Sequence, residues 1–176
     1  MTLPQIPQRT TPGFAFPGLN RALLECIAVR KFGANQVKEL LEFFGGGEPS
    51  CAFCGTTAVQ RWDHLVPVTK GGDTVLGNMV LACGKCDDSK GDRPYDEWAV
   101  GSTPGSPRAR GVADIEQRVA RIREYVARYG YRPKSPEERL NEEEVQKFEV
   151  LRADLAKLRK DFDEFIMVYR RRSGLR

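Results

Sequence analysis

Residues 51–98 read CAFCGTTAVQRWDHLVPVTKGGDTVLGNMVLACGKCDDSKGDRPYDEW, and this stretch holds the residues that decide the fold. It contains two Cys-x-x-Cys pairs, Cys51 with Cys54 and Cys83 with Cys86. Thiolates at this spacing can bind one ion from a tight turn, and two such pairs supply four sulfur ligands for a closed tetrahedral Zn²⁺ site. The sequence therefore predicts a structural zinc held by these four cysteines.

The segment between the two pairs, residues 55–82, is longer than an ordinary zinc-ribbon spacing, which indicates that a further element is built into it. It contains Asp63 and His64, and His64 is the only histidine of the chain. No other side chain of this stretch has an unperturbed pKa near neutrality, so His64 is the candidate general base.

The order of apolar and polar residues around this segment predicts two short strands and a helix. The strands should lie near residues 59–64 and 78–82. The helix should begin near Asp87, with the Cys83–Cys86 turn holding its start.

With these residues in place, the stretch resembles the HNH nucleases, the ββα-metal fold in its zinc-stabilised form. The likeness rests on the Asp-His-x-x-Pro step at 63–67, the Gly-Gly turn at 71–72, the Asn-hydrophobic-hydrophobic run from Asn78 and the Cys-x-x-Cys-Asp-x-x-Lys ending at 83–90. It covers a little over a quarter of the chain. The resemblance implies a metal-dependent endonuclease that hydrolyses DNA phosphodiester bonds.

The resemblance also implies a role for each polar residue. His64 would activate water, while Asp63 and Asp87 would bind a catalytic Mg²⁺ or Mn²⁺. Asn78 would brace the loop and orient the histidine without binding the ion. Asp87 departs from the family, which usually has Asn or His at this position, although a carboxylate still suits a hard cation.

Four basic side chains are predicted to contact DNA: Lys90, Arg93, Arg118 and Arg121. The first two match, or lie near, a basic position of the family. The other two follow from charge, because residues 51–98 carry a balance of −2 and residues 108–132 one of +4. Phosphate affinity should therefore come largely from outside the zinc module, although an arginine-rich helix is often only a solvated face.

The whole chain has the composition of a soluble globular protein, with 40 % hydrophobic and 30 % charged residues and a net charge of +4. No apolar run approaches the ~20 residues that a membrane-spanning helix needs, and the N-terminus lacks the order of a secretory signal. We therefore expect a cytoplasmic protein, microbial or phage-encoded, whose thiols stay reduced and which has no membrane partner.

The predicted fold class is α+β, with a small zinc-bound ββα-metal core flanked by N-terminal helices and long C-terminal helices. Residues 1–18 are rich in Pro and Gly and should form an extended arm, and residues 19–47 an N-terminal helical segment. Residues 48–100 are the zinc module and 101–111 a linker. Residues 112–176 form a C-terminal region with an Arg-rich helix and a long amphipathic helix.

The last helix is expected to be ~35 residues long, or roughly 50 Å. Its apolar residues alternate at spacings of four and three, as in a coiled-coil seam: Leu151, Leu155, Leu158, Phe162, Phe165 and Tyr169. This helix either packs back on the helices at 19–44 and 114–129, or pairs with a second copy as a homodimer. A dimer could cut both strands of DNA.

The kind of nuclease stays open at this point. A site-specific restriction or defence enzyme and a phage- or mobile-element nicking enzyme both fit the same residues. A third hypothesis, from a different class, is a non-catalytic zinc-containing DNA-binding or assembly module that retains the scaffold. Asp87 in place of the usual residue is the only feature that favours it.

Overall fold

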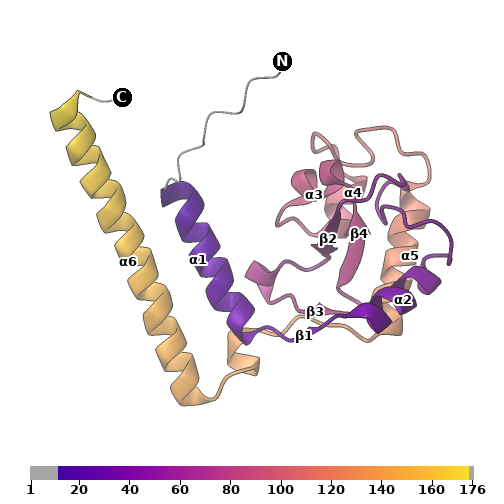
Figure 1. The fold of residues 1–176 in the computed structure, drawn as a ribbon, viewed down its shortest axis with the longest axis horizontal. Helices are drawn as coiled ribbons and strands as arrows, with labels where there is room; N and C mark the ends of the chain where they lie inside the picture. The colour runs from indigo at the N-terminus through magenta and orange to yellow at the C-terminus, as the bar shows by residue number, and fades with distance from the viewer. Residues whose placement is uncertain (1–11, 175–176) are drawn as a thin grey trace.

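The computed structural model describes residues 12–174 as helices with two small two-stranded sheets (Figure 1). The elements in chain order, with η marking 3-10 helices, are α1 (Pro12–Ile27), β1 (Arg30–Lys31), α2 (Ala34–Phe43), β2 (Arg61–His64), η1 (Val68–Lys70), β3 (Thr74–Val75), β4 (Met79–Ala82), α3 (Gly84–Lys90), α4 (Tyr95–Val100), α5 (Ile115–Arg128), η2 (Pro136–Glu138) and α6 (Glu142–Ser173). The predicted α+β class, with a cysteine cluster in its sheet-containing part, is confirmed.

The predicted strand–strand–helix unit is formed by β2, β4 and α3. β2 pairs antiparallel with β4, which places Asp63 opposite Val80 and His64 opposite Met79. The apolar run of β4 is buried, and α3 follows it directly. The order of these elements follows the sequence prediction, because the alternation of apolar residues and the cysteine turn are both local signals.

α5 closes the core on the side of the hairpin away from α1 (Figure 1). Its apolar residues recur at three- and four-residue spacings and form one buried face: Ile115, Val119, Ile122 and Tyr125. The hydroxyl of Tyr125 donates to the carbonyl oxygen of Met79 at 3.0 Å, so the buried phenol is paired. This helical face, rather than the few strand residues, supplies much of the apolar core.

The Gly-Gly turn is required by a close approach of backbone segments. A Cβ on Gly72 would lie 1.8 Å from the carbonyl oxygen of Val66. Gly71 has φ +81°, and a Cβ there would lie 2.5 Å from the carbonyl oxygen of Lys134. A residue with a Cβ would clash with a carbonyl oxygen at either position, so both must be glycine. The two glycines therefore allow the chain before α6 to pack against the loop after β2.

A buried ion pair then joins three distant parts of the chain. Asp73 Oδ1 accepts from the backbone N–H of Val29 and from Nη1 of Arg139, each at 2.7 Å. Both side chains of the pair are only 8 % exposed. Arg139 Nη2 also donates to the carbonyl oxygen of Gly71 at 2.9 Å. These bonds hold the α1–β1 connection and the approach to α6 on the zinc module.

The N-terminal part differs from the prediction. Residues 12–18 were expected to be extended, but α1 begins at Pro12 and includes Pro17. Tertiary packing outweighs the hydrogen bond that Pro17 removes, because Phe16 is buried and lies edge-on to Phe162 of α6, with ring centroids 6.3 Å apart. The rest of the predicted arm, residues 1–11, lies outside the described residues.

The segment 101–111 has no regular helix or strand but is packed against its surroundings. Ser106 is fully buried, and its hydroxyl donates to the carbonyl oxygen of Gly101 at 2.7 Å. The backbone N–H of Arg108 donates to the carbonyl oxygen of Ala99 at 3.1 Å. The expected linker is therefore an ordered connection between α4 and α5.

α6 lies beside α1 and runs antiparallel to it, away from α5 (Figure 1). The long helix was expected to pack on the helices at 19–44 and 114–129; it packs on α1 as expected, but the packing on 114–129 is wrong, because α5 lies on the far side of the hairpin (Figure 1). α1 alone cannot cover the whole apolar surface of α6. Large apolar side chains on α6 are exposed: Val150, Leu151, Leu158, Phe162, Phe165, Met167, Val168 and Tyr169. Among residues 12–174, no helix has the length and apolar character needed to cross a membrane.

Candidate active site and zinc centre

The four cysteines meet as the spacing predicts. Their Sγ atoms all lie within 4.8 Å of one another, and Cys54 Sγ lies 3.7 Å from Cys83 Sγ. A tetrahedral site with Zn–S bonds of about 2.3 Å has sulfur–sulfur edges of about 3.8 Å, so the cluster has the size of a zinc site. One pair comes from the turn before β2 and the other from the start of α3, so the ion would join the strand hairpin to the helix.

The four thiols differ in how readily they ionise. A hydrogen bond from Cys86 lowers the pKa of the Cys51 thiol to about 5, whereas burial raises the pKa of Cys54 and the bond with Cys51 raises the pKa of Cys86. Arg110 Nη2 donates to Cys86 Sγ at 2.8 Å, which brings a positive charge to the sulfur cluster. Sequence reasoning included Arg110 only in the charge of the linker, because its contact depends on how residues 101–111 fold back.

Asn78 holds the loop that follows β2. Its side chain is fully buried; Oδ1 accepts from the N–H of Val66 at 2.8 Å, and Nδ2 donates to the carbonyl oxygens of Val66 and Asp73 at 3.1 and 2.8 Å. Every polar group of this amide is thus engaged in fixing the loop. The arrangement is that of a bracing residue, because its one side-chain oxygen already accepts a hydrogen bond within the loop.

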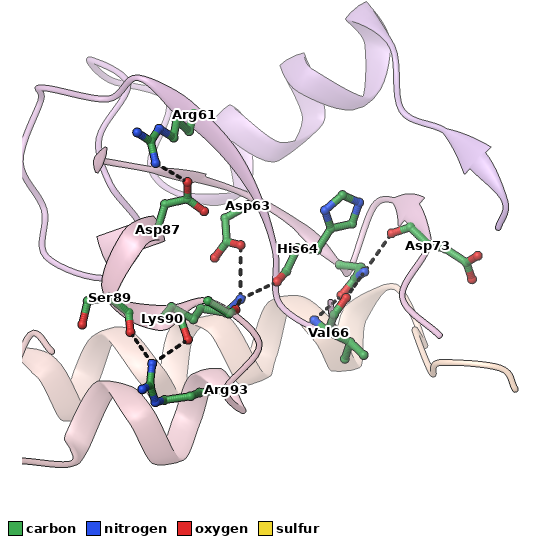
Figure 2. A network of polar contacts seen from close by, with 11 residues as sticks. Arg61, Asp63, His64, Val66, Asp73, Asp87, Ser89, Lys90 and Arg93 are labelled. Carbon is green, nitrogen blue, oxygen red and sulfur yellow. Dashed lines mark hydrogen bonds and ion pairs between the residues drawn. The ribbon is translucent and has the colours of Figure 1, made fainter. Parts of the chain in front are cut away.

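Asp63 is buried, and one of its carboxylate oxygens lacks a partner. Oδ1 lies 3.1 Å from the ammonium of Lys90, whereas Oδ2 has no hydrogen-bond partner in residues 12–174 (Figure 2). Burial raises the pKa of Asp63 to about 6, against the opposing effect of Lys90. An unpaired buried oxygen is costly, so this atom is a candidate ligand for a cation.

Asp87, on α3, brings a second carboxylate to the same side of β2 (Figure 2). Its Oδ2 accepts from Arg61 Nη1 at 2.7 Å, and Arg61 also pairs with Asp88. Arg61 lies two residues before Asp63 on β2, so its side chain leaves the same face of the strand. Arg61 was not predicted as a site residue, because only the packing of α3 against β2 brings it to Asp87.

The imidazole of His64 is half-buried, and its Nε2 lies 3.0 Å from the hydroxyl oxygen of Thr74. Burial lowers the pKa of His64 to about 4, and the positive charges of Arg21 and Lys90 act in the same direction. The ring is therefore neutral at pH 7, as a general base requires. Thr74 was not predicted, because the β1–β3 pairing that positions it is a contact between distant segments.

These side chains open onto a groove of about 750 Å³ between α1 and the zinc module. The ionisable residues that line it are Arg21, Arg61, Asp63, His64, Asp87 and Asp92. Asp63 and His64 are adjacent on a strand and point in different directions (Figure 2), yet both line this groove. The groove is thus the place where an ion, a base and a substrate could meet.

None of the four basic residues predicted to bind DNA lines this groove. The prediction for Lys90 is wrong, because its ammonium is fully buried and held by Asp63 and backbone oxygens. Arg93 is exposed and donates to the carbonyl oxygens of Ser89 and Lys90 at the end of α3. Figure 2 shows Arg93 on the side of the site away from the His64 imidazole, and the Lys90 ammonium between Asp63 and the backbone of His64.

Arg118 and Arg121 lie on α5, on the other side of the hairpin from α1 (Figure 1). Arg118 pairs with Asp114 at 2.8 Å, and Arg121 lies over the ring of Phe43, 4.1 Å from its centroid. Both arginines therefore have partners within the fold. Their contact with DNA stays a prediction.

The fold and the site define a strand–strand–helix module with four cysteines positioned to bind a metal ion and a groove lined by carboxylates and a histidine. Comparison with known families agrees with this description: residues 51–93 match the family model described as HNH endonuclease. That stretch is an HNH endonuclease domain, and the resemblance inferred from the sequence is confirmed.

Two curated relatives are similar to part of the chain. CRISPR-associated endonuclease Cas9 of Corynebacterium diphtheriae is 34 % identical over 86 residues, which is 47 % of this chain and 7 % of the relative. The Cas9 of Actinomyces naeslundii is 37 % identical over 54 residues, which is 28 % of this chain and 5 % of the relative. The similarity thus extends beyond the HNH domain but spans a small share of either relative. No solved structure matches the chain significantly.

Proposed function

We propose that the chain is a metal-dependent endonuclease that hydrolyses DNA phosphodiester bonds in the groove beside His64. The observation that carries this proposal is that a neutral imidazole and a buried carboxylate with an unpartnered oxygen line one groove. The family match over residues 51–93 and the similarity to two CRISPR-associated endonucleases support the same activity.

Asp63 and Asp87 would hold a divalent cation, Mg²⁺ or Mn²⁺. The residues fit such an ion, because Oδ2 of Asp63 is a buried acceptor without a donor and Asp87 adds a second carboxylate on the same groove. Carboxylate oxygens are the ligands that these hard cations prefer. When bound, the ion would neutralise charge on the scissile phosphate and on the leaving oxygen.

His64 would take a proton from the attacking water. If its Nε2–H donates to Thr74, the lone pair of Nδ1 is the one left to accept that proton. The lowered pKa keeps the ring neutral before the reaction, and Thr74 limits its rotation. Asn78 fixes the loop at Val66, two residues after His64, and so restrains the backbone on which the imidazole is carried.

The zinc would have a purely structural role. All four of its ligand positions are filled by cysteines, so no position is open to water or substrate. The same closed site would also be found in the alternative, a non-catalytic module that binds DNA or another partner. That alternative gives no reason for the unpaired oxygen of Asp63, so we favour the enzyme.

The test is cleavage of supercoiled plasmid with added Mg²⁺, with Mn²⁺ and without a divalent ion, beside a His64→Ala variant. We expect ion-dependent cutting that the variant loses by about 100-fold or more, the usual contribution of a general base. Open circles would indicate a nicking enzyme and discrete linear fragments a site-specific one. Zinc-loaded, folded protein that cuts with neither ion would contradict the proposal and favour the binding module.

A further inference from the structure

We propose that the groove takes a single strand of DNA and that Arg21 of α1 binds one of its phosphates. This inference rests on the proposed function, since it names the substrate of the same site. It comes from α1, which lies outside the stretch that matches the HNH family.

The groove has two walls of different origin. On one side are β2 and the loop after it, which carry Trp62 and His64. On the other side is α1, which contributes Phe14 and Arg21. A substrate that reaches His64 must therefore lie between the HNH domain and this helix.

The size of the groove favours an unpaired strand. Its volume of about 750 Å³ falls in the range of about 300–1,000 Å³ found for pockets that hold a drug-sized ligand. Such a space admits about one or two nucleotides. A duplex would reach His64 only if α1 moved away, and the contact of Phe16 with Phe162 and the bonds of Asp73 hold α1 in place.

The groove also has the two kinds of side chain that bind single strands. Phe14 is 76 % and Trp62 40 % exposed, so both aromatic rings can stack on an unpaired base. Phe32 supports Trp62 edge-on, with ring centroids 5.1 Å apart. In a duplex the bases already stack on one another and offer no free face, so these exposed rings gain little from double-stranded DNA.

Arg21 is the cation of α1 that lines the groove. Its Nε lies 2.9 Å from Glu25 one turn later, and its side chain is 57 % exposed. A surface pair of this kind contributes little to stability, so Arg21 can exchange its partner for a phosphate at small cost. The charge would then sit beside His64, where the backbone of the strand must pass.

The first test measures binding without cleavage, using the His64→Ala protein and a fluorescein-labelled strand of about 20 nucleotides, alone or as a duplex, at several salt concentrations. We expect the strand to bind at least about 10-fold more tightly than the duplex. Arg21→Ala should lower the slope of log K against log salt by about 0.7, the loss of one phosphate contact on a single strand. Arg159→Ala is the matched control, because Arg159 forms the same kind of exposed pair, with Asp163 on α6.

The stacking part of the proposal is tested by Phe14→Ala in the same assay. Loss of one stacked base should weaken binding of the single strand by about 5- to 150-fold and leave duplex binding unchanged. Leu19→Ala is the control, because Leu19 is an exposed apolar residue of the same helix that does not line the groove.

The outcomes separate this inference from the proposed function. Single-strand binding that depends on Arg21 and Phe14, in a protein that cuts no plasmid, would support the groove and contradict the nuclease. The groove inference alone would be overturned if plasmid cutting needs His64 but the duplex binds at least as tightly as the single strand and Arg21→Ala has no effect.

A second inference comes from a different observation, the exposed apolar stripe of α6. We infer that α6 pairs antiparallel with α6 of a second copy of this chain. The residues of the stripe recur at intervals of seven and are more than half exposed: Leu151 at 55 %, Leu158 at 55 % and Phe165 at 63 %. Phe162, between Leu158 and Phe165, lies against Phe16 of α1, so α1 covers only part of the seam.

The charges of α6 fit a second copy in the antiparallel direction. Its first turn carries Glu142, Glu143 and Glu144, and its last turn carries Arg170, Arg171 and Arg172. An antiparallel pair with its two-fold axis near Leu158 places the acidic end of each helix against the basic end of the other. A parallel pair would instead align like charges at both ends.

The same alignment also pairs the apolar residues. Leu151 of one copy would face Phe165 of the other, and Leu158 would meet its own copy. The helix has 32 residues, so the seam would be about 48 Å long.

Sedimentation velocity at several protein concentrations tests the pairing. The intact chain should be dimeric, and Leu158→Glu should make it monomeric while its circular dichroism stays helical. Changing Glu142, Glu143 and Glu144 to Arg should raise the dissociation constant about 10-fold or more, since it places like charges opposite each other in the antiparallel pair. A monomeric chain at tens of micromolar, or a dimer indifferent to the charge reversal, would overturn this inference.

Discussion

The ammonium of Lys90 is buried against the carboxylate of Asp63, with Nζ 3.1 Å from Oδ1 (Figure 2). The side chain of Lys90 is 1 % exposed, and Nζ also donates to the carbonyl oxygens of His64 and Gly91 at 2.7 and 3.4 Å. The lysine therefore links α3 to the end of β2. It uses one oxygen of Asp63 and leaves the other without a partner among residues 12–174, so it positions the proposed ligand instead of binding phosphate.

Replacing Lys90 by Met should destabilise the fold by about 3–5 kcal/mol, because a buried carboxylate and two backbone oxygens lose their donor. Urea unfolding of the zinc-loaded protein measures this change. Lys85→Met is the control, since Lys85 is exposed on the same helix and should change stability by at most about 0.5 kcal/mol. Equal effects of the two substitutions would show that the buried pair contributes nothing specific.

Replacing Thr74 by Val should lower the rate of plasmid cleavage by about 10- to 100-fold, since the imidazole of His64 loses the hydroxyl that orients it. Thr74→Ser keeps the hydroxyl and should retain most of the rate. Both variants should bind the labelled strand like the parent protein. A Val variant as active as the Ser variant would exclude an orienting role for this contact.

Removing the zinc should unfold the HNH domain, because the ion would join the turn before β2 to the start of α3. We expect one zinc per chain by metal analysis and loss of the cooperative thermal transition after chelation. Cys51→Ser should act like chelation, whereas Cys26→Ser should not, since Cys26 is exposed and apart from the cluster. A metal-free chain with an unchanged transition would argue against a structural role for the ion.

Replacing Arg139 by Met should loosen the α1–α6 pair from the HNH domain, because Asp73 would be left as a buried charge without its partner. The backbone N–H of Val29 donates to Asp73 and that of Thr74 donates to Val29, so both amides should exchange with solvent faster by about 100-fold or more. Arg132→Met removes only an exposed pair with Glu138 and should leave both amides unchanged. Slow exchange in the Arg139 variant would mean that the ion pair is dispensable.

The sequence by itself determined the zinc module. Its signals are short-range patterns: the cysteine spacing, the alternation around Asp63 and His64 and the apolar run of β4. Each of them sets the local backbone conformation through residues that are close in the sequence. For the same reason the strand–strand–helix order and the cysteine cluster could be predicted without any knowledge of the rest of the fold.

The tertiary structure alone decided which side chains surround the proposed chemistry. Thr74 reaches His64 through the pairing of β1 with β3, and Arg21 reaches the groove because α1 is helical and held by α6. Local propensity predicted an extended arm at residues 12–18, and the family motif predicted that Lys90 faces phosphate. Both predictions failed because burial of apolar surface and the pairing of a buried charge are set by contacts between distant segments, which no local pattern encodes.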